Sequence, residues 1–346
     1  MARHTIGING FGRIGRLVLR CALCDKSVQQ VAHINDPFLS VDAAAYLFQH
    51  DSVHGRFSGS VSTKDGALLI DDATIVFTSE RDPTRIPWAT SGTACIIESS
   101  GAFTTGAAAA MHLTAGAQKV IISAPAKDLE TAVIVLGVNE ESYDRGSMHV
   151  LSNASCTTNC LAPLAKVVND AFGIEEGMMT TVHAVTASQS AVDGPAKKDW
   201  RSGRSILNNI IPASTGAAYA VTRALPELQG KLNGMAFRVP VADVSVVDLV
   251  VRTRDKAPMA AVVDSLRKAE AGRMRGILKV TDQMVVSSDF VGEKASAVFD
   301  VNASMALNDH MLKLVAWYDN EMGYAQRCVE LAAFVMVRQA QAGKEE

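Results

Sequence analysis

The first half of the chain alternates short apolar runs with amphipathic segments. Thr5 to Asn9 reads as a buried strand, and apolar residues at helical spacing follow it over 14–21. Further buried-strand patterns occur at 31–35, 94–98, 120–123, 133–136 and 149–151, and an Ala-rich helix is expected over about 105–115. Repeated strand–helix units at this spacing predict a Rossmann-type, doubly wound parallel sheet in an α/β domain.

The segment from 56 to 78 does not follow this alternation of strands and helices. Its short alternating runs at 59–62, 67–70 and 74–77 are separated by turn residues such as Lys64-Asp65-Gly66. The pattern predicts a small antiparallel insertion.

The second half of the chain has a different pattern of apolar and polar residues. Residues 178–186 alternate as a strand that places Thr181, His183 and Val185 on one face. More strands are expected around 235–239, 244–252, 297–301 and 312–318, with helices near 260–271 and at the C-terminus. These elements predict an α+β domain with a mainly antiparallel sheet. The long irregular stretch over 188–209 is typical of a functional loop or an interface.

Composition narrows the classes of function. The chain has 346 residues, which suits two domains, and a net charge of −3, which gives no bulk attraction to nucleic acid or anionic membranes. We see no credible membrane span, signal peptide or metal-binding motif. Six scattered cysteines do not form a disulfide framework, and Cys21 and Cys24 read as packing residues. We therefore expect a cytoplasmic protein that requires neither nucleic acid nor membrane.

A glycine motif follows the first strand in the context that dinucleotide binding requires. Gly10 permits a tight turn, and Gly12 lets a pyrophosphate approach the backbone at a helix start. Asp36 ends the second strand, 21 residues after Gly15, where a carboxylate can bind ribose hydroxyls and repel a 2′-phosphate. The order of strand, motif, helix, strand and acid favours a Rossmann-type cofactor site over a merely structural turn, and the acid favours NAD over NADP.

The uncharged run from Ser152 to Cys160 leads into an apolar segment, and Cys156 is our candidate nucleophile. If the segment over 161–168 is helical, unpaired backbone N–H groups and the helix dipole at its start stabilise a thiolate. The alternative is a buried structural thiol, which is how we interpret Cys160.

Several segments resemble phosphorylating glyceraldehyde-3-phosphate dehydrogenase almost residue for residue, and the likeness extends over essentially the whole chain. They are residues 8–16, 35–37, 51–57, 152–165, 210–218, 230–240 and 317–321. The resemblance implies an NAD-binding domain formed by 1–154 and 318–346, and a catalytic domain formed by 155–317. It also implies a homotetramer with the 188–209 loop at an interface.

The resemblance implies a reaction as well. Cys156 matches the nucleophile that forms a thiohemiacetal and then a thioester, and His183 matches its acid–base partner. The substrates would be glyceraldehyde 3-phosphate, NAD and inorganic phosphate, and the product 1,3-bisphosphoglycerate, a step shared by glycolysis and gluconeogenesis.

The other implied site residues fall into two groups. Residues matching the cofactor site are Gly10, Phe11, Gly12, Arg13, Ile14, Asp36, Arg81, Ser123, Asn320 and Tyr324. Residues matching the phosphate sites are Thr186, Ser188 and Arg238 for the substrate, and Ser155, Thr157, Thr215 and Gly216 for the attacking phosphate. Arg suits bidentate phosphate binding, and hydroxyls and backbone N–H groups donate at short range.

Three residues depart from the pattern of the family, and two other functions are alternatives to the dehydrogenase. Ser188, Tyr219 and Ser100 differ from the residues common in the family. An erythrose-4-phosphate dehydrogenase is the nearest alternative, although the segment over 183–188 keeps the glyceraldehyde type. A non-catalytic binding protein on the same fold could use the basic stretch over 197–204, but the near-neutral charge and the retained Cys156 and His183 argue against it. An accessible thiolate would also be oxidisable, so a redox-sensing role could coexist.

Overall fold

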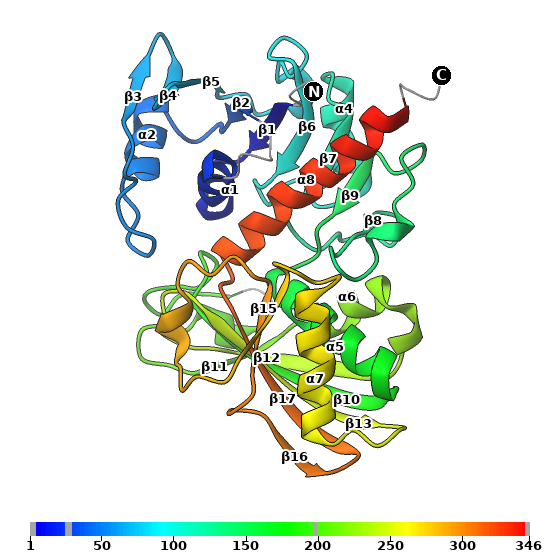
Figure 1. The fold of residues 1–346 in the computed structure, drawn as a ribbon. Coiled ribbons are helices and arrows are strands. Elements are labelled where there is room, and N and C mark those ends of the chain that lie inside the picture. The colour runs from blue at the N-terminus through cyan, green and yellow to red at the C-terminus, as the bar shows by residue number, and fades with distance from the viewer. Residues whose placement is uncertain (1–4, 25–29, 197–198, 343–346) are drawn as a thin grey trace. The chain divides into compact units, whose positions relative to one another are not determined.

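The structure is a computed structural model that describes residues 5–24, 30–196 and 199–342 (Figure 1). Lys197 and Lys198 of the basic stretch therefore lie outside the described residues, as do both chain ends. By compactness the chain divides into unit 1, residues 1–134, 141–154 and 325–346, and unit 2, residues 135–140 and 155–324. The assignment of a separate function to each predicted domain stays a prediction.

Unit 1 contains a nine-stranded, mostly parallel sheet in the order β3-β4-β5-β2-β1-β6-β7-β9-β8. All neighbours from β5 to β8 run parallel, and β3, β4 and β5 pair antiparallel, as predicted for the insertion. The strands are β1 (Thr5–Asn9), β2 (Val31–Asn35), β3 (Val61–Lys64), β4 (Ala67–Ile70), β5 (Ala73–Thr78), β6 (Thr93–Glu98), β7 (Lys119–Ile122), β8 (Ala132–Val133) and β9 (Val150–Ser152).

The helices of unit 1 follow the strands in the alternation that the sequence predicts. They are α1 (Arg13–Cys24), α2 (Val41–Gln49), α3 (Gly106–Ala109), α4 (Met111–Thr114) and most of α8 (Met322–Ala342). The Ala-rich helix expected over 105–115 is divided at Ala110 into α3 and α4. The buried residues Ala109 and His112 lie on either side of this break.

The core of unit 1 holds a titratable side chain, His33 of β2, which is 0% exposed. Its Nδ1 lies 3.0 Å from the Ser91 hydroxyl, its Nε2 lies 2.9 Å from the Thr78 hydroxyl, and its ring packs against Trp88. Burial lowers the pKa of His33 to about 4, whereas an unfolded histidine titrates near 6.5. Between these values the folded chain binds fewer protons, so stability is lost as the pH falls from about 6.5 to about 4.

We expect His33→Gln to flatten this acid dependence. The variant is less stable at pH 7, but its Tm falls less between pH 7 and pH 4.5, by on the order of 2 °C. Calorimetry of both proteins over that range is the measurement. An unchanged slope would show that His33 does not contribute to acid unfolding.

Unit 2 contains an eight-stranded sheet in the order β11-β12-β10-β13-β17-β15-β14, with β16 on β17. Its pairs are antiparallel except β10 with β12 and β14 with β15. The strands are β10 (Ile174–His183), β11 (Ile211–Ser214), β12 (Leu232–Arg238), β13 (Ser245–Thr253), β14 (Leu278–Thr281), β15 (Ala297–Asp300), β16 (Met305–Asn308) and β17 (Met311–Tyr318).

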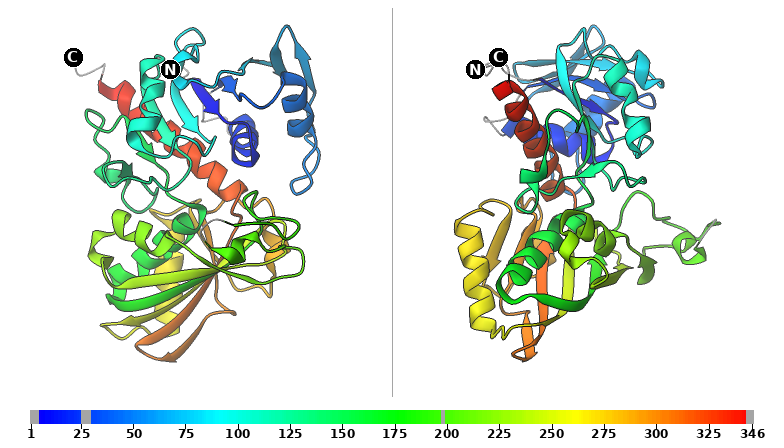
Figure 2. Two further views of the ribbon diagram at one scale, coloured as in Figure 1. Left: turned by 180° about the vertical axis from the view of Figure 1, so that it is seen from behind. Right: turned by 90° about the vertical axis from the view of Figure 1, so that its right-hand side faces the viewer.

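Helices α5 (Cys156–Phe172), α6 (Ala217–Ala224) and α7 (Met259–Ala271) cover one face of the unit 2 sheet. These helices lie in front of the sheet in Figure 1, and the view from behind shows the strands on the opposite face (Figure 2, left). Strand β17 follows this arrangement, because every second residue from Leu312 to Tyr318 is buried and the residues between them are partly exposed. The predicted α+β architecture is therefore confirmed.

Two further expectations concern the whole chain. All six cysteines lie among the described residues and none is disulfide-bonded. None of the helices within the described ranges is both long and apolar enough to cross a membrane.

Candidate active site

A glycine turn joins β1 to α1 in unit 1. Gly10 has φ +90°, and a Cβ at this position would lie 2.4 Å from the Ser100 backbone nitrogen, so a side chain is excluded. A Cβ at Gly12 would have no described atom within 4 Å, which leaves the backbone open to a ligand. The helix begins at Arg13, so its first N–H groups lack helical partners. This is the arrangement that favours a pyrophosphate.

Asp36 follows β2 and lies against this turn. One carboxylate oxygen accepts from the Phe11 backbone N–H at 2.8 Å, and the other accepts from the Phe38 N–H at 2.8 Å. The side chain is thus fixed, and each oxygen retains a lone pair for a ribose hydroxyl. The structure thus places Asp36 directly after β2 and beside the cavity turn, and its ribose-binding role stays a prediction.

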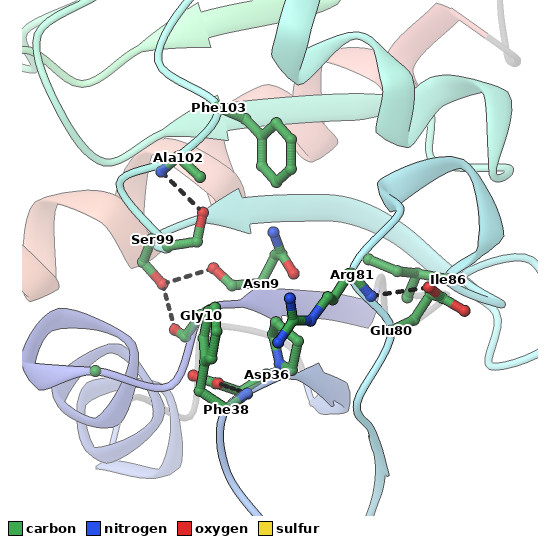
Figure 3. A pocket seen from close by; sticks show the side chains of 13 residues that line it. Asn9, Gly10, Asp36, Phe38, Glu80, Arg81, Ile86, Ser99, Ala102 and Phe103 are labelled. Carbon is green, nitrogen blue, oxygen red and sulfur yellow. Dashed lines mark hydrogen bonds between the residues drawn. The ribbon is translucent and has the colours of Figure 1, made fainter.

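A cavity of about 300 Å³ opens beside Gly10 and Asp36 (Figure 3). Phe38, Phe103 and Ile86 supply apolar walls, and Arg81 and Asn9 supply polar groups. The Phe38 ring is 79% exposed and lies 5.2 Å from the Arg81 guanidinium carbon. A glycine turn at a helix start, a carboxylate after the second strand and flat apolar walls together fit NAD.

The predicted cofactor residues are not all in this cavity. Gly10, Gly12, Asp36 and Arg81 line it. Phe11 instead stacks on Phe48, Arg13 pairs with Asp51 at 2.5 Å, Ile14 is half-buried on α1, and Ser123 follows β7. Asn320 and Tyr324 belong to unit 2 and are buried there, where Asn320 accepts from the Ser245 hydroxyl at 2.7 Å. Their cofactor roles stay predictions.

Sequence reasoning missed several cavity residues, including Phe38, Phe103 and Asn9. A signal existed for Phe38, because a large aromatic directly after Asp36-Pro37 stands at the carboxyl end of a parallel strand. It also missed a chain of hydrogen bonds linking strand ends beside the cavity. The Asn9 amide donates to Glu98 at 2.5 Å, Asn35 donates to Asn9 at 2.8 Å, and Thr78 donates to Asn35 at 2.8 Å. These residues are neighbours in register on β6, β1, β2 and β5.

Helix α5 of unit 2 begins at Cys156. Ser155 caps it by accepting from the Thr158 N–H at 3.0 Å, and the helix ends before Gly173, which has φ +65°. The helix expected over 161–168 is confirmed and is longer than predicted. The Cys156 thiol therefore stands at a helix N-terminus, as the nucleophile hypothesis requires.

His183 ends β10 and faces this thiol. Its Nε2 lies 3.5 Å from Cys156 Sγ, and the side chain is 3% exposed. Its Nδ1 lies 2.7 Å from the Ala184 carbonyl oxygen and 2.6 Å from an Arg238 nitrogen. A nucleophile and a base within reach, with a third group orienting the base, are the components of nucleophilic catalysis.

Burial dominates the electrostatics of both groups. It lowers the pKa of His183 to about 4, with the Arg238 charge adding to the effect and the Ala184 carbonyl opposing it. Burial also raises the pKa of the Cys156 thiol, although the Thr157 hydroxyl, the Arg238 charge and backbone N–H groups oppose the rise. The hydrogen bonds and the Arg238 charge favour the thiolate, as expected at a helix start, and burial acts in the opposite direction.

The predicted phosphate residues lie at four places in unit 2: the end of β12, the segment after β10, the start of α6 and the start of α5. Arg238 pairs with His183 in the β10–β12 register, and the Thr186 hydroxyl lies 3.0 Å from that of Ser188. Thr215 and Gly216 precede α6, where the Thr215 hydroxyl accepts from the Ala217 N–H at 3.2 Å. A neighbour that sequence reasoning missed is Gln189, whose side-chain oxygen accepts from the Thr186 N–H at 2.6 Å.

Thr157 has a different environment from the one predicted. It is 4% exposed, and its hydroxyl lies 2.9 Å from the Tyr318 hydroxyl, which also lies 2.8 Å from that of Thr181. Nothing in the spacing of these three residues signals this buried cluster. The phosphate-binding role of Thr157 stays a prediction.

Comparisons with known proteins bear on both units. The family described as glyceraldehyde 3-phosphate dehydrogenase, NAD binding domain, matches residues 4–106, and the family described as its C-terminal domain matches residues 155–320. The chain is 56% identical over 338 residues to glyceraldehyde-3-phosphate dehydrogenase 1 of Schizosaccharomyces pombe, covering 98% of this chain and 99% of that one. It is 56% identical over 335 residues to the cytosolic enzyme of Gracilaria gracilis, covering 97% and 99%, and 54% identical over 343 residues to enzyme 3 of Caenorhabditis elegans, covering 98% and 100%.

Proposed function

The chain belongs to the glyceraldehyde-3-phosphate dehydrogenase family, and we propose that Cys156 and His183 are the catalytic residues of its NAD-dependent reaction. The observation that supports this assignment is the approach of Cys156 Sγ, at the start of α5, to 3.5 Å from His183 Nε2. Aldehyde oxidation by hydride loss requires a tetrahedral adduct, and a thiol with an adjacent base can form one.

The first chemical step uses the thiol of Cys156 and the imidazole of His183. Sγ attacks the aldehyde carbon, and His183 Nε2 takes the thiol proton, which passes to the new alkoxide to give a thiohemiacetal. A His183 pKa of about 4 keeps the imidazole neutral, and therefore able to accept a proton, throughout the physiological range. Helix α5 directs its N-terminal N–H groups toward developing negative charge.

The second half of the reaction makes and breaks the thioester. Bound NAD supplies the hydride acceptor, while His183 takes the hydroxyl proton of the thiohemiacetal. A phosphate oxygen then attacks the thioester carbon, the carbon–sulfur bond breaks, and Sγ leaves to regain a proton from His183. The product is an acyl phosphate, and Cys156 and His183 return to their initial state.

Two anion sites serve the two phosphates in this proposal. Arg238, Thr186 and Ser188 would bind the phosphate of the aldehyde, and Ser155, Thr157, Thr215 and Gly216 would bind the attacking one. The guanidinium is half-buried and offers a planar fork of donors, which suits a phosphate monoester. Thr215 and Gly216 before α6 offer a hydroxyl and backbone N–H groups at a helix start.

Asp36 supplies a test of the cofactor site. We expect Asp36→Asn to raise the KM for NAD about tenfold or more, because charge-assisted bonds to the ribose are lost. The same change removes the repulsion of a 2′-phosphate, so kcat/KM for NADP rises relative to that for NAD. Initial rates with both cofactors measure this.

Asp51→Asn is the matched control for this prediction. Asp51 supports the same turn through Arg13 and the Val53 and His54 N–H groups, but does not line the cavity. It should lower activity with both cofactors by similar factors. An equal loss with both cofactors in Asp36→Asn would mean that Asp36 is only structural.

Substrate rates distinguish this enzyme from an erythrose-4-phosphate dehydrogenase, which the names of its relatives disfavour. NADH formation should be faster with glyceraldehyde 3-phosphate than with erythrose 4-phosphate and should require inorganic phosphate. A strong preference for erythrose 4-phosphate, with indifference to phosphate, would contradict the proposal.

We also propose a cytoplasmic homotetramer. Exposed apolar side chains in the loop over 188–209, including Trp200 at 84% and Val192 at 74%, support an interface between copies. Six free cysteines and a relative named cytosolic support the location. Light scattering in solution should give four times the chain mass, and a monomer would contradict the assembly.

A further inference from the structure

Glu98, the last residue of β6, carries a buried carboxylate surrounded by donors. Its side chain is 1% exposed. Oε2 accepts from the Asn9 amide at 2.5 Å and lies 3.0 Å from His112 Nε2. Oε1 accepts from the Ser100 backbone N–H at 2.8 Å and from the Ser100 hydroxyl. Two of these partners, Asn9 and Ser100, line the cavity of unit 1, and Figure 3 shows Asn9 there.

The hydrogen bond from His112 has a fixed direction. The Trp88 indole N–H, which can only donate, lies 3.1 Å from Nδ1 of His112. Nδ1 therefore accepts, and the ring donates to Glu98 through the proton on Nε2. The side chains of Trp88 and His112 are both fully buried, so this arrangement is part of the core.

The hydrogen bond from Asn9 has a fixed direction as well. Oδ1 of Asn35 accepts from the Glu80 backbone N–H at 2.9 Å and from the Thr78 hydroxyl at 2.8 Å. Because a backbone N–H can only donate, the amide of Asn35 cannot be reversed, and its nitrogen donates to Oδ1 of Asn9 at 2.8 Å. Asn9 must then turn its own amide nitrogen toward Glu98. One N–H of that amide bonds to the carboxylate, and the second is the donor that Asn9 offers to the cavity.

A carboxylate satisfies all of these donors, whereas the isosteric amide of glutamine does not. With its oxygen toward Asn9 and His112, a glutamine in place of Glu98 would direct its NH₂ group at the Ser100 backbone N–H. With its oxygen toward Ser100, it would direct the NH₂ group at the donors of Asn9 and His112. A buried donor that faces another donor is destabilising, so either orientation displaces a residue that lines the cavity.

We propose that Glu98 is a positioning residue for the cofactor: its carboxylate fixes the Asn9 amide so that the second N–H donates to an oxygen of the ADP-ribose part of NAD. This inference rests on the proposed function, in which the cavity beside Gly10 and Asp36 binds that part of the cofactor. Glu98 thus acts through Asn9.

The same carboxylate also fixes the chain after β6 beside the glycine turn. The Ser99 hydroxyl donates to the Gly10 carbonyl oxygen at 2.7 Å, and the Ser100 hydroxyl accepts from the Ala102 N–H at 3.1 Å. Since Glu98 holds Ser100 on one side and Asn9 on the other, it connects the ends of β6 and β1, which are neighbours in register. Its loss should therefore weaken cofactor binding and leave the reacting atoms in unit 2 unchanged.

Calorimetric titration with ADP-ribose and with NAD tests the proposal without turnover. Glu98→Gln should raise the Kd of both ligands about tenfold. The KM for NAD should rise by a similar factor, while kcat at saturating NAD should stay within about twofold of the wild type. Should Glu98→Gln not fold, Glu98→Asp, which withdraws the carboxylate by one methylene, takes its place in every comparison.

A double-mutant cycle tests whether Glu98 acts through Asn9. Asn9→Ala alone should raise the Kd of ADP-ribose about tenfold, because it removes the proposed donor. If the two residues act through one contact, the double variant Glu98→Gln/Asn9→Ala should bind about 10- to 20-fold more weakly than the wild type. Two independent effects would multiply to about 100-fold, and that result would overturn the proposal.

Trp88→Phe is the matched control, since it removes the hydrogen bond to His112 at the end of the network that is remote from Asn9. It should lower the Tm but leave the Kd of ADP-ribose within about twofold of the wild type. A Kd raised as much as in Glu98→Gln would show that the network is merely structural and would overturn the proposal, as would an unchanged Kd in Glu98→Gln or Asn9→Ala. If neither ADP-ribose nor NAD binds the wild type, the proposed cofactor site is wrong, and the role of Glu98 is wrong with it.

Discussion

Cys156→Ser is expected to lower kcat for NADH formation by about four orders of magnitude or more. A serine hydroxyl keeps the shape and hydrogen bonding of the thiol but is far less acidic and a weaker nucleophile, so the thiohemiacetal forms too slowly. The variant should still fold and bind NAD, because the cavity that we propose for the cofactor is lined by residues of unit 1. Initial rates and NAD titration of the same preparation separate the two effects.

Cys160→Ala is the control for this substitution. Cys160 lies one helical turn after Cys156, is 0% exposed, and has its Sγ 3.9 Å from the Ala316 carbonyl oxygen. Its loss leaves a small cavity and costs about 1 kcal/mol of stability, with activity within a few-fold of the wild type. If Cys156→Ser keeps a tenth of the wild-type rate, covalent catalysis by Cys156 is wrong.

His183→Asn is expected to lower kcat by about 10²- to 10⁴-fold and to change the pH dependence of the rate. In the wild type the base remains neutral down to about pH 4, so activity should be nearly level through the neutral range. In the variant, which lacks this base, the reaction depends on spontaneous ionisation of the Cys156 thiol. Burial raises the pKa of this thiol. The residual rate should therefore increase with pH throughout the alkaline range.

The measurement is kcat/KM between pH 6 and pH 9.5 for the wild type and the variant. His149→Asn is the matched control, since the His149 side chain is exposed and its ring bonds to the nearby Gly146 carbonyl. This variant should retain activity within about twofold. Equal pH profiles for wild type and His183→Asn would contradict the role of His183 as the base.

Local spacing was sufficient to predict the glycine turn after β1. The roles that we propose for Gly10, Gly12 and Asp36 depend on backbone conformation and strand order, both of which are visible in a short window of sequence. Phe103 could not be found in this way. Phe103 lines the cavity because the chain after β6 lies beside the glycine turn. This proximity depends on the order of strands in the sheet, which the spacing of apolar residues does not predict.

The surroundings of the Cys156 thiol could also be predicted only in part from local sequence. The helix start at Cys156 is a local feature and was predicted, but the net direction of its pKa depends on burial by residues distant in the sequence. The contact between His183 and Arg238 depends on a parallel register between β10 and β12, which are far apart along the chain. Even the whole-chain resemblance, which named these residues, did not predict that Arg238 touches the imidazole.

A single-turnover experiment without phosphate tests the central claim, a thioester on Cys156, most directly. Enzyme is mixed with excess NAD and glyceraldehyde 3-phosphate, NADH is counted, and the quenched protein is analysed by peptide mass spectrometry. The account predicts a burst of one NADH per active chain, acylation of the peptide containing Cys156, and resumed turnover when phosphate is added. A burst with Cys156 unmodified, or an acyl group on another residue, would contradict it.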